Sequence, residues 1–133
     1  MLFFGNAQAA NGIDDDEVLI ADEERTVLVA DLRAALWAMN PSQRYEVQRN
    51  PENIERILDS LYINSVLSEE ARSSGLAETP EVRQRIVQAR ETELSRLYAR
   101  EAPDNVPSWE ELEQDRSITL HSDRIEAWRE QAD

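Results

Sequence analysis

The sequence has no cysteine, only three glycines and a single histidine among its 133 residues. Without cysteine there is no disulfide, no thiol nucleophile and no thiolate metal site. The histidine, His121, lies in a polar terminal segment with no Gly-rich elbow nearby, so a Ser-His-Asp arrangement is not indicated. Three scattered glycines cannot form a phosphate-binding loop. We therefore expect no catalytic residues, no cofactor and no metal ion on this chain.

Lysine is also absent: all 14 basic residues are arginine, and 28 acidic residues give a formal net charge of −14. A surface of this sign repels the phosphates of nucleic acids, which makes a nucleic-acid partner an unfavourable interpretation. No stretch approaches the roughly 18 consecutive apolar residues of a transmembrane helix, so none is expected. The acidity indicates either a solubilising surface or adaptation to a salty, exposed compartment where carboxylates are screened.

The first ten residues end in an Ala-x-Ala pattern, with Ala7 and Ala9 at the small-residue positions of a signal-peptidase site. The apolar stretch before this pattern is short and has no basic start. Two interpretations stay open: the remnant of an export signal, or an unstructured leader. We expect residues 1–16 to be disordered and, on the first interpretation, the protein to be periplasmic or otherwise exported.

Two short β-like segments precede the helical part of the chain. Residues 18–21 and 26–29 flank the polar stretch 22–25, which predicts a small hairpin. Such a hairpin is marginal on its own in water, so it must pack against helices. Apolar side chains at helical spacing then predict a helix over residues 31–39, which Asn40-Pro41 ends.

Two longer helices have clear boundary signals. Asn50 and Pro51 predict the start of the first, and Gly75 suits a left-handed cap after its end. Thr79-Pro80 repeats the starting signal for the second, which extends to about Arg100.

Shorter helices follow a break at residues 102–107. Ser108 and Glu111 form a capping-box pattern, and a last helix is predicted over residues 122–132. The predicted fold class is therefore mainly α, a small bundle of about five helices with a short N-terminal β-hairpin.

Aromatic side chains exceed what so small a core needs. They are the three tryptophans and three tyrosines, Trp37, Tyr45, Tyr62, Tyr98, Trp109 and Trp128. Ile63 and Val66 also widen the apolar stripe of their helix beyond what one neighbour covers. Apolar surface left open between helices would hold extended or helical peptide segments. The alternative is that these side chains simply close the core.

The order of these elements resembles the N-terminal domain of SurA-like chaperones, exported members of the parvulin-type peptidyl-prolyl isomerase family. Short motifs carry the resemblance, which spans about Val18 to Gln114. They are VLVADLRAAL (27–36), ILDSLYIN (57–64), LSEEARSSGL (67–76), TPEVRQRI (79–86) and VPSWEEL (106–112). The sequence departs from the family twice: Leu28 or Val29 replaces the usual Ser or Thr cap, and the parvulin domain with its pair of histidines is missing.

The resemblance implies that residues 17–116 form a SurA-like helical chaperone domain, followed by a strand and helix extension over 117–133. Such a domain would hold apolar segments of unfolded or nascent exported polypeptides without ATP, metal or catalysis. Because the parvulin domain is missing, the resemblance does not imply isomerase activity for this chain. A longer parent protein that contains this chain can still be an isomerase. The residues expected to contact peptide are Leu36, Trp37, Leu61, Tyr62, Leu94 and Tyr98. The alternative is a dedicated adaptor for one partner, or a homodimer.

Overall fold

The computed structural model describes residues 13–132, so the Ala-x-Ala leader lies outside the described residues. The described chain is mainly helical, with six α-helices and one antiparallel two-stranded hairpin at its N-terminal side. The predicted fold class, mainly α with a short hairpin, is confirmed. The chain divides into two compact units, Met1–Glu91 and Thr92–Asp133, referred to below as the first and second units. No helix among residues 13–132 has the length and apolar content needed to span a bilayer.

The predicted hairpin consists of β1 (Val18–Ala21) and β2 (Thr26–Leu28). Val18 is opposite Leu28, Ile20 opposite Val27 and Ala21 opposite Thr26, with an irregularity in register between Val18 and Ile20. Asp22 closes the turn because its Oδ1 atom accepts the N–H groups of Glu24 at 2.7 Å and Arg25 at 2.8 Å. Asp favours turns through bonds of this kind.

Helix α2 (Val29–Trp37) begins without a Ser or Thr cap. Carbonyls of the acidic run before the hairpin act as the cap instead, since Glu17 accepts the N–H of Val29 and Asp15 that of Ala30, both at 2.9 Å. The Asp31 carboxylate accepts the N–H of Leu28 at 2.8 Å. The first N–H groups of a helix have no partner inside it, and here the preceding segment supplies the missing acceptors.

Helix α3 (Pro41–Arg49) is absent from the sequence-based prediction, in which Asn40-Pro41 only ends the preceding helix. The same two residues also start a helix. The Asn40 side chain accepts the N–H of Gln43 at 2.8 Å, and Pro41 occupies the first helical position, where its missing N–H costs nothing. Helix α2 ends at Trp37, two residues before the predicted Met39.

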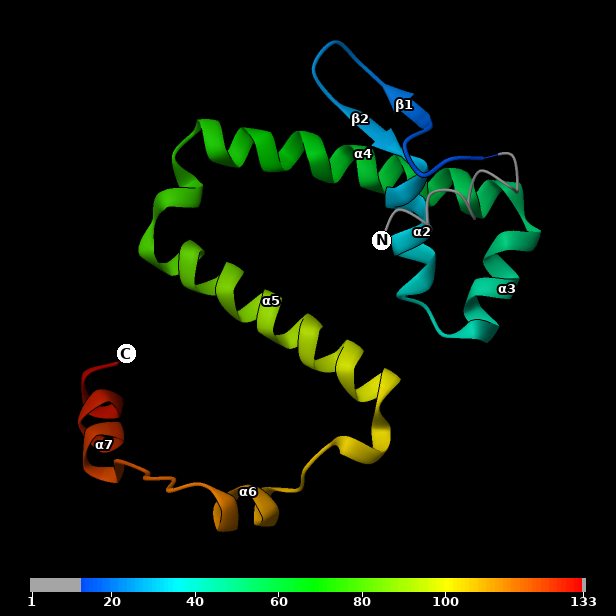
Figure 1. Ribbon diagram of the computed structural model, residues 1–133. Coiled ribbons are helices and arrows are strands. Elements are labelled where there is room, and N and C mark those ends of the chain that lie inside the picture. The colour runs from blue at the N-terminus through cyan, green and yellow to red at the C-terminus, as the bar shows by residue number, and fades with distance from the viewer. Residues whose placement is uncertain (1–12, 133) are drawn as a thin grey trace. The chain divides into compact units, whose positions relative to one another are not determined.

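Helix α4 (Pro51–Ser73) is the element that joins the N-terminal part of the first unit: the hairpin, α2 and α3 all contact it (Figure 1). Asn50 caps it as predicted, accepting the N–H of Glu52 at 3.0 Å. The core beside it contains three buried apolar residues among those described, Val27, Val29 and Leu36. Gly75, with φ of 86°, provides the predicted left-handed turn into the 3₁₀ segment η1 (Leu76–Glu78).

Helix α5 (Pro80–Glu101) starts in the first unit and continues into the second. The second unit then contains the 3₁₀ segment η2 (Pro103–Asn105), α6 (Trp109–Asp115) and α7 (Ser122–Gln131). Between α6 and α7, residues 117–121 form neither a helix nor a paired strand. No described residue of the second unit is buried.

Candidate peptide-binding surface

Two neighbouring residues at the end of α2 face opposite environments. Leu36 is 8% exposed and belongs to the core, whereas Trp37 is 45% exposed. Adjacent positions on a helix point about 100° apart, which accounts for the difference. The prediction that Leu36 contacts a peptide therefore needs correction, because its side chain supports the core and offers almost no surface. Trp37 offers an aromatic surface.

Arg44 of α3 fixes the backbone from which Trp37 projects. Its Nε atom donates to the carbonyl of Leu36 at 3.1 Å. Its Nη2 atom donates to the carbonyls of Met39 at 3.1 Å and Trp37 at 3.4 Å. The last carbonyls of a helix lack partners inside it and carry partial negative charge, so a guanidinium here stabilises the end of α2. The position of Trp37 is thus set by a partly buried side chain from the next helix.

Tyr62 connects α4 to the hairpin turn. Its hydroxyl donates to Oδ2 of Asp22 at 2.6 Å, and Nη1 of Arg25 donates to the same oxygen at 2.7 Å. The bond from Tyr62, followed by the backbone N–H of Glu24, holds the pKa of Asp22 well below its usual value of 3.8. The same bond to Asp22 raises the pKa of Tyr62 above 10.0. Tyr62 is half-buried, so its polar end supports the fold while part of its ring remains accessible.

Leu61, the residue before Tyr62, lines a groove where β2 and α2 meet α4. The groove has a volume of about 260 Å³ and is lined by Thr26, Val27, Asp31, Leu61, Asn64, Ser65 and Ser68. Typical small-molecule pockets start at about 300 Å³, so this volume suits one or two peptide side chains better than a whole ligand. Its lining combines the apolar Val27 and Leu61 with polar side chains from α2, β2 and α4, which fits a segment with side chains of both kinds.

The groove-lining residues other than Leu61 were not predicted as site residues. One signal was present: Asn64, Ser65 and Ser68 follow Leu61 by three, four and seven positions, which places them on its face of the helix. No comparable spacing in the sequence indicated the residues on the β2 side of the groove. Thr26 and Val27 come close to α4 only through the packing of the hairpin.

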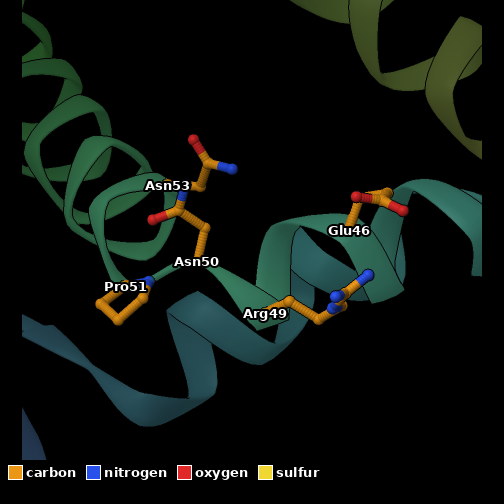
Figure 2. A pocket seen from close by; sticks show the side chains of 5 residues that line it. All are labelled: Glu46, Arg49, Asn50, Pro51 and Asn53. Carbon is orange, nitrogen blue, oxygen red and sulfur yellow. The ribbon is translucent and has the colours of Figure 1, made fainter.

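Two open depressions lie beside α3. Figure 2 shows the first, of about 380 Å³, between Glu46 and Arg49 of α3 and Asn50, Pro51 and Asn53 at the start of α4. Local structure already engages three of its polar side chains. Asn50 caps α4, Asn53 accepts from Arg56 at 2.9 Å, and the Arg49 guanidinium lies 5.4 Å from the ring centre of Tyr45. The side chains of Asn50, Asn53 and Arg49 in this depression therefore serve the fold itself.

The second depression has an apolar component. It has a volume of about 370 Å³ and is lined by Met39, Ser42, Gln43, Glu46 and Val47. Met39 and Val47 are half-buried here and offer an apolar edge beside the end of α2. Sequence reasoning missed this feature because it did not predict α3.

Leu94 and Tyr98 lie four residues apart on α5, so they share one face of the helix. Both are exposed. They belong to the second unit, whereas Leu36, Trp37, Leu61 and Tyr62 belong to the first. The predicted peptide-binding residues thus form two groups, a first-unit group around α2 and α4 and a pair on α5.

No family model matches the chain, and no curated protein or solved structure matches it. The resemblance to SurA-like domains therefore depends on the sequence motifs alone. Among residues 13–132, no three acidic or histidine side chains converge in a way that could hold a metal ion. What the described surface does offer is apolar side chains, open grooves and acidic surroundings.

Proposed function

We propose that this chain is a non-catalytic chaperone-type domain that binds apolar segments of unfolded exported polypeptides. We further propose that it is part of, or related to, a parvulin-type peptidyl-prolyl isomerase. The observation that carries the proposal is the exposure of Trp37 on α2 and of the pair Leu94 and Tyr98 on one face of α5. Exposed apolar side chains that gather in patches mark interaction sites.

The first-unit surface supports binding of peptide side chains. The groove beside Leu61 has room for a side chain, and Trp37 offers a flat aromatic contact on a backbone segment whose carbonyls are bound by Arg44. A surface positioned in advance loses little conformational entropy on binding. The net charge of −14 would keep a complex with an aggregation-prone client soluble. Export is part of the proposal and depends on the Ala-x-Ala leader, which lies outside the described residues.

An aggregation assay with an unfolded client, such as casein, tests this function. We expect the wild-type chain to suppress aggregation at stoichiometric excess, and Trp37→Ser with Tyr98→Ser to suppress it much less. Trp109→Ser is the matched control, because Trp109 is an exposed aromatic residue outside the predicted surface. Absence of suppression by the wild-type chain would overturn the proposal.

The alternative of a dedicated adaptor or homodimer has one observation in its favour. Ile125 and Trp128 are exposed three residues apart on α7, so they form a compact apolar pair on a short helix. Light scattering over a range of concentrations distinguishes the two functions. A dimer that Trp128→Ser dissociates would favour the alternative, and a concentration-independent monomer would favour the chaperone.

A further inference from the structure

Helix α4 carries a second apolar surface, separate from the groove beside Leu61. Ile63 is 53% exposed and Leu67 is 60% exposed, and Val66 between them is half-buried. At 100° per residue, these three side chains are centred about 190° around the helix from Leu61. The face of α4 opposite the hairpin groove is therefore an apolar surface that stays exposed at Ile63 and Leu67.

A carboxylate lies at each end of this surface. Asp59 precedes Ile63 by four residues, and Glu70 follows Val66 by four, so each is one helical turn from the apolar centre. We call Asp59, Ile63, Val66, Leu67 and Glu70 the acid-ended patch. Neither carboxylate has a hydrogen bond or ion pair within residues 13–132.

The arginines of α4 are engaged with other groups. Arg56 donates to the side chain of Asn53 at 2.9 Å, and Arg72 pairs with Glu69 at 3.3 Å. The acid-ended patch is thus an apolar centre between two carboxylates that no cation of the same helix neutralises. This charge pattern favours a partner with the opposite sign at both ends.

We infer that the acid-ended patch binds polypeptide segments that have an apolar centre and a Lys or Arg at each end. A second copy of the chain is a poor occupant, because an antiparallel pairing of two α4 helices would bring Asp59 of one against Glu70 of the other. Like charges in contact are destabilising, and each copy carries a net charge of −14. Nucleic acids and anionic membranes are repelled for the same reason.

The length of the patch sets the spacing of the basic residues. Eleven helical positions separate Asp59 from Glu70, a rise of about 16 Å. An extended chain covers that distance in about five residues at roughly 3.3 Å each. Side chains alternate between the two faces of an extended chain, so the two basic residues must be an even number of positions apart to face α4 together. A spacing of six, about 20 Å, lets the long Lys or Arg side chains reach both carboxylates. The fitting segment is therefore a basic residue, five apolar residues and a second basic residue. The inference rests on the proposed function only for the class of partner, an unfolded polypeptide. The charge of the partner's end residues and the spacing between them follow from the positions of Asp59 and Glu70 on α4.

Fluorescence anisotropy with labelled, end-blocked peptides tests this. The probe is Lys-Leu-Val-Ile-Leu-Val-Lys. One comparison peptide has Glu in place of both lysines, and another has the same composition with both lysines at one end. We expect the Glu-ended peptide to bind about tenfold more weakly, from loss of two ion pairs and gain of two repulsions. This difference should shrink with added salt, since exposed charges are screened.

Variants locate the site. Asp59→Asn with Glu70→Gln removes two ion pairs without adding a repulsion, so it should weaken the Lys-ended probe about threefold and leave a Gln-ended peptide unchanged. Glu81→Gln with Glu91→Gln on α5 removes the same charge elsewhere and is the matched control. Ile63→Ser with Leu67→Ser should remove binding of all the peptides, with circular dichroism verifying that α4 still folds. Asp59 and Glu70 are exposed, so the variant with Asp59→Asn and Glu70→Gln still tests the inference if the serine variant does not fold.

The outcomes separate the two proposals. Equal binding of Lys-ended and Glu-ended peptides would overturn the inference, even if the chain suppresses client aggregation. The same holds if light scattering detects a dimer that Leu67→Ser dissociates, because a second copy would then occupy the patch. Charge-dependent peptide binding without suppression of aggregation would support the acid-ended patch and count against the chaperone function.

Discussion

In the first unit, Val27, Val29 and Leu36 are buried, whereas the described part of the second unit has no buried residue. The difference does not come from helix formation, because both units contain helices with well-defined starts. Asn50 caps α4 in the first unit, and Ser108 caps α6 in the second. Capping and helix periodicity therefore determine where helices form, but they do not by themselves create a core.

The contacts that distinguish the first unit join residues far apart in the sequence. Tyr62 and Asp22 are forty residues apart, and the hairpin that contains Asp22 packs against α4. In the second unit, the Glu93–Arg96 and Glu126–Arg129 ion pairs connect residues three positions apart. Pairs of this kind stabilise a helix by about 0.2–0.5 kcal/mol and leave its apolar face uncovered. The first unit thus gains stability from packing, and the second offers apolar surface.

The largest expected effect comes from removing part of the first-unit core. Leu36→Ala should lower the free energy of unfolding of the first unit by about 2–5 kcal/mol, because it leaves a cavity among packed side chains. Urea unfolding monitored by Trp37 fluorescence, with Trp109 and Trp128 changed to Phe, measures this. Ile125→Ala on α7 is the control and should change stability by less than about 0.5 kcal/mol. Equal effects of the two substitutions would show that the units do not differ in packing.

A smaller effect is expected from the bond between the hairpin and α4. Tyr62→Phe removes the hydroxyl that Asp22 accepts, while the hairpin keeps its other contacts with α4. Both groups are partly exposed, so water replaces some of what is lost. The first unit should be less stable than wild type at neutral pH, but more stable than Leu36→Ala. Tyr98→Phe, an exposed position in the second unit, is the control and should leave the first unit unchanged.

The pH dependence of this bond has a definite sign. The folded-state pKa of Asp22 is lowered from 3.8, so its contribution is present above that value and is lost as the pH falls through the folded pKa. The pKa of Tyr62 is raised above 10.0, so its contribution is present below that value and is lost as the pH rises through the folded pKa. Tyr62→Phe should flatten the stability profile at both ends. An unchanged profile would mean that the bond does not fasten the hairpin.

Local signals account for the parts of the fold that the sequence predicted. Asn50-Pro51, Thr79-Pro80 and the Ser108–Glu111 box each place a helix start from residues within three positions of one another. Gly75 adopts a positive φ that other residues rarely take, so its role was also readable locally. The α3 helix was missed because Asn40-Pro41 can end one helix and start another, and the bond from the Gln43 N–H to the Asn40 side chain is what identifies it as a start.

Features that depend on distant backbone atoms had no sequence signature. The start of α2 is capped by the carbonyls of Asp15 and Glu17, and every residue type has a carbonyl. The groove beside Leu61 exists only because β2 packs against α4. At the site itself, Leu36 and Trp37 are neighbours on α2 and were both predicted to contact peptide, but which of them is buried depends on the position of α4. Sequence reasoning thus named apolar candidates without separating core from surface.

The smallest effect is expected in the second unit, where Ser108→Ala removes the cap of α6. The N–H of Glu111 loses its acceptor at 3.1 Å, and the return bond from the N–H of Ser108 to the Glu111 carboxylate, at 2.9 Å, weakens with it. Loss of a cap costs about 0.5–2 kcal/mol of helix stability. A seven-residue helix is marginal on its own, so we expect α6 to open locally.

Amide hydrogen exchange of residues 110–115 measures this opening, and urea unfolding of the first unit should not change. Ser108→Asp is the matched variant, because Asp caps about as well as Ser and should keep α6 protected. The bond from the Ser108 N–H lowers the pKa of Glu111, so the capping box should also weaken as the pH falls through that lowered value. If Ser108→Ala instead destabilised the first unit as much as Leu36→Ala does, the second unit would contribute to a shared core, because a local cap cannot produce so large an effect elsewhere.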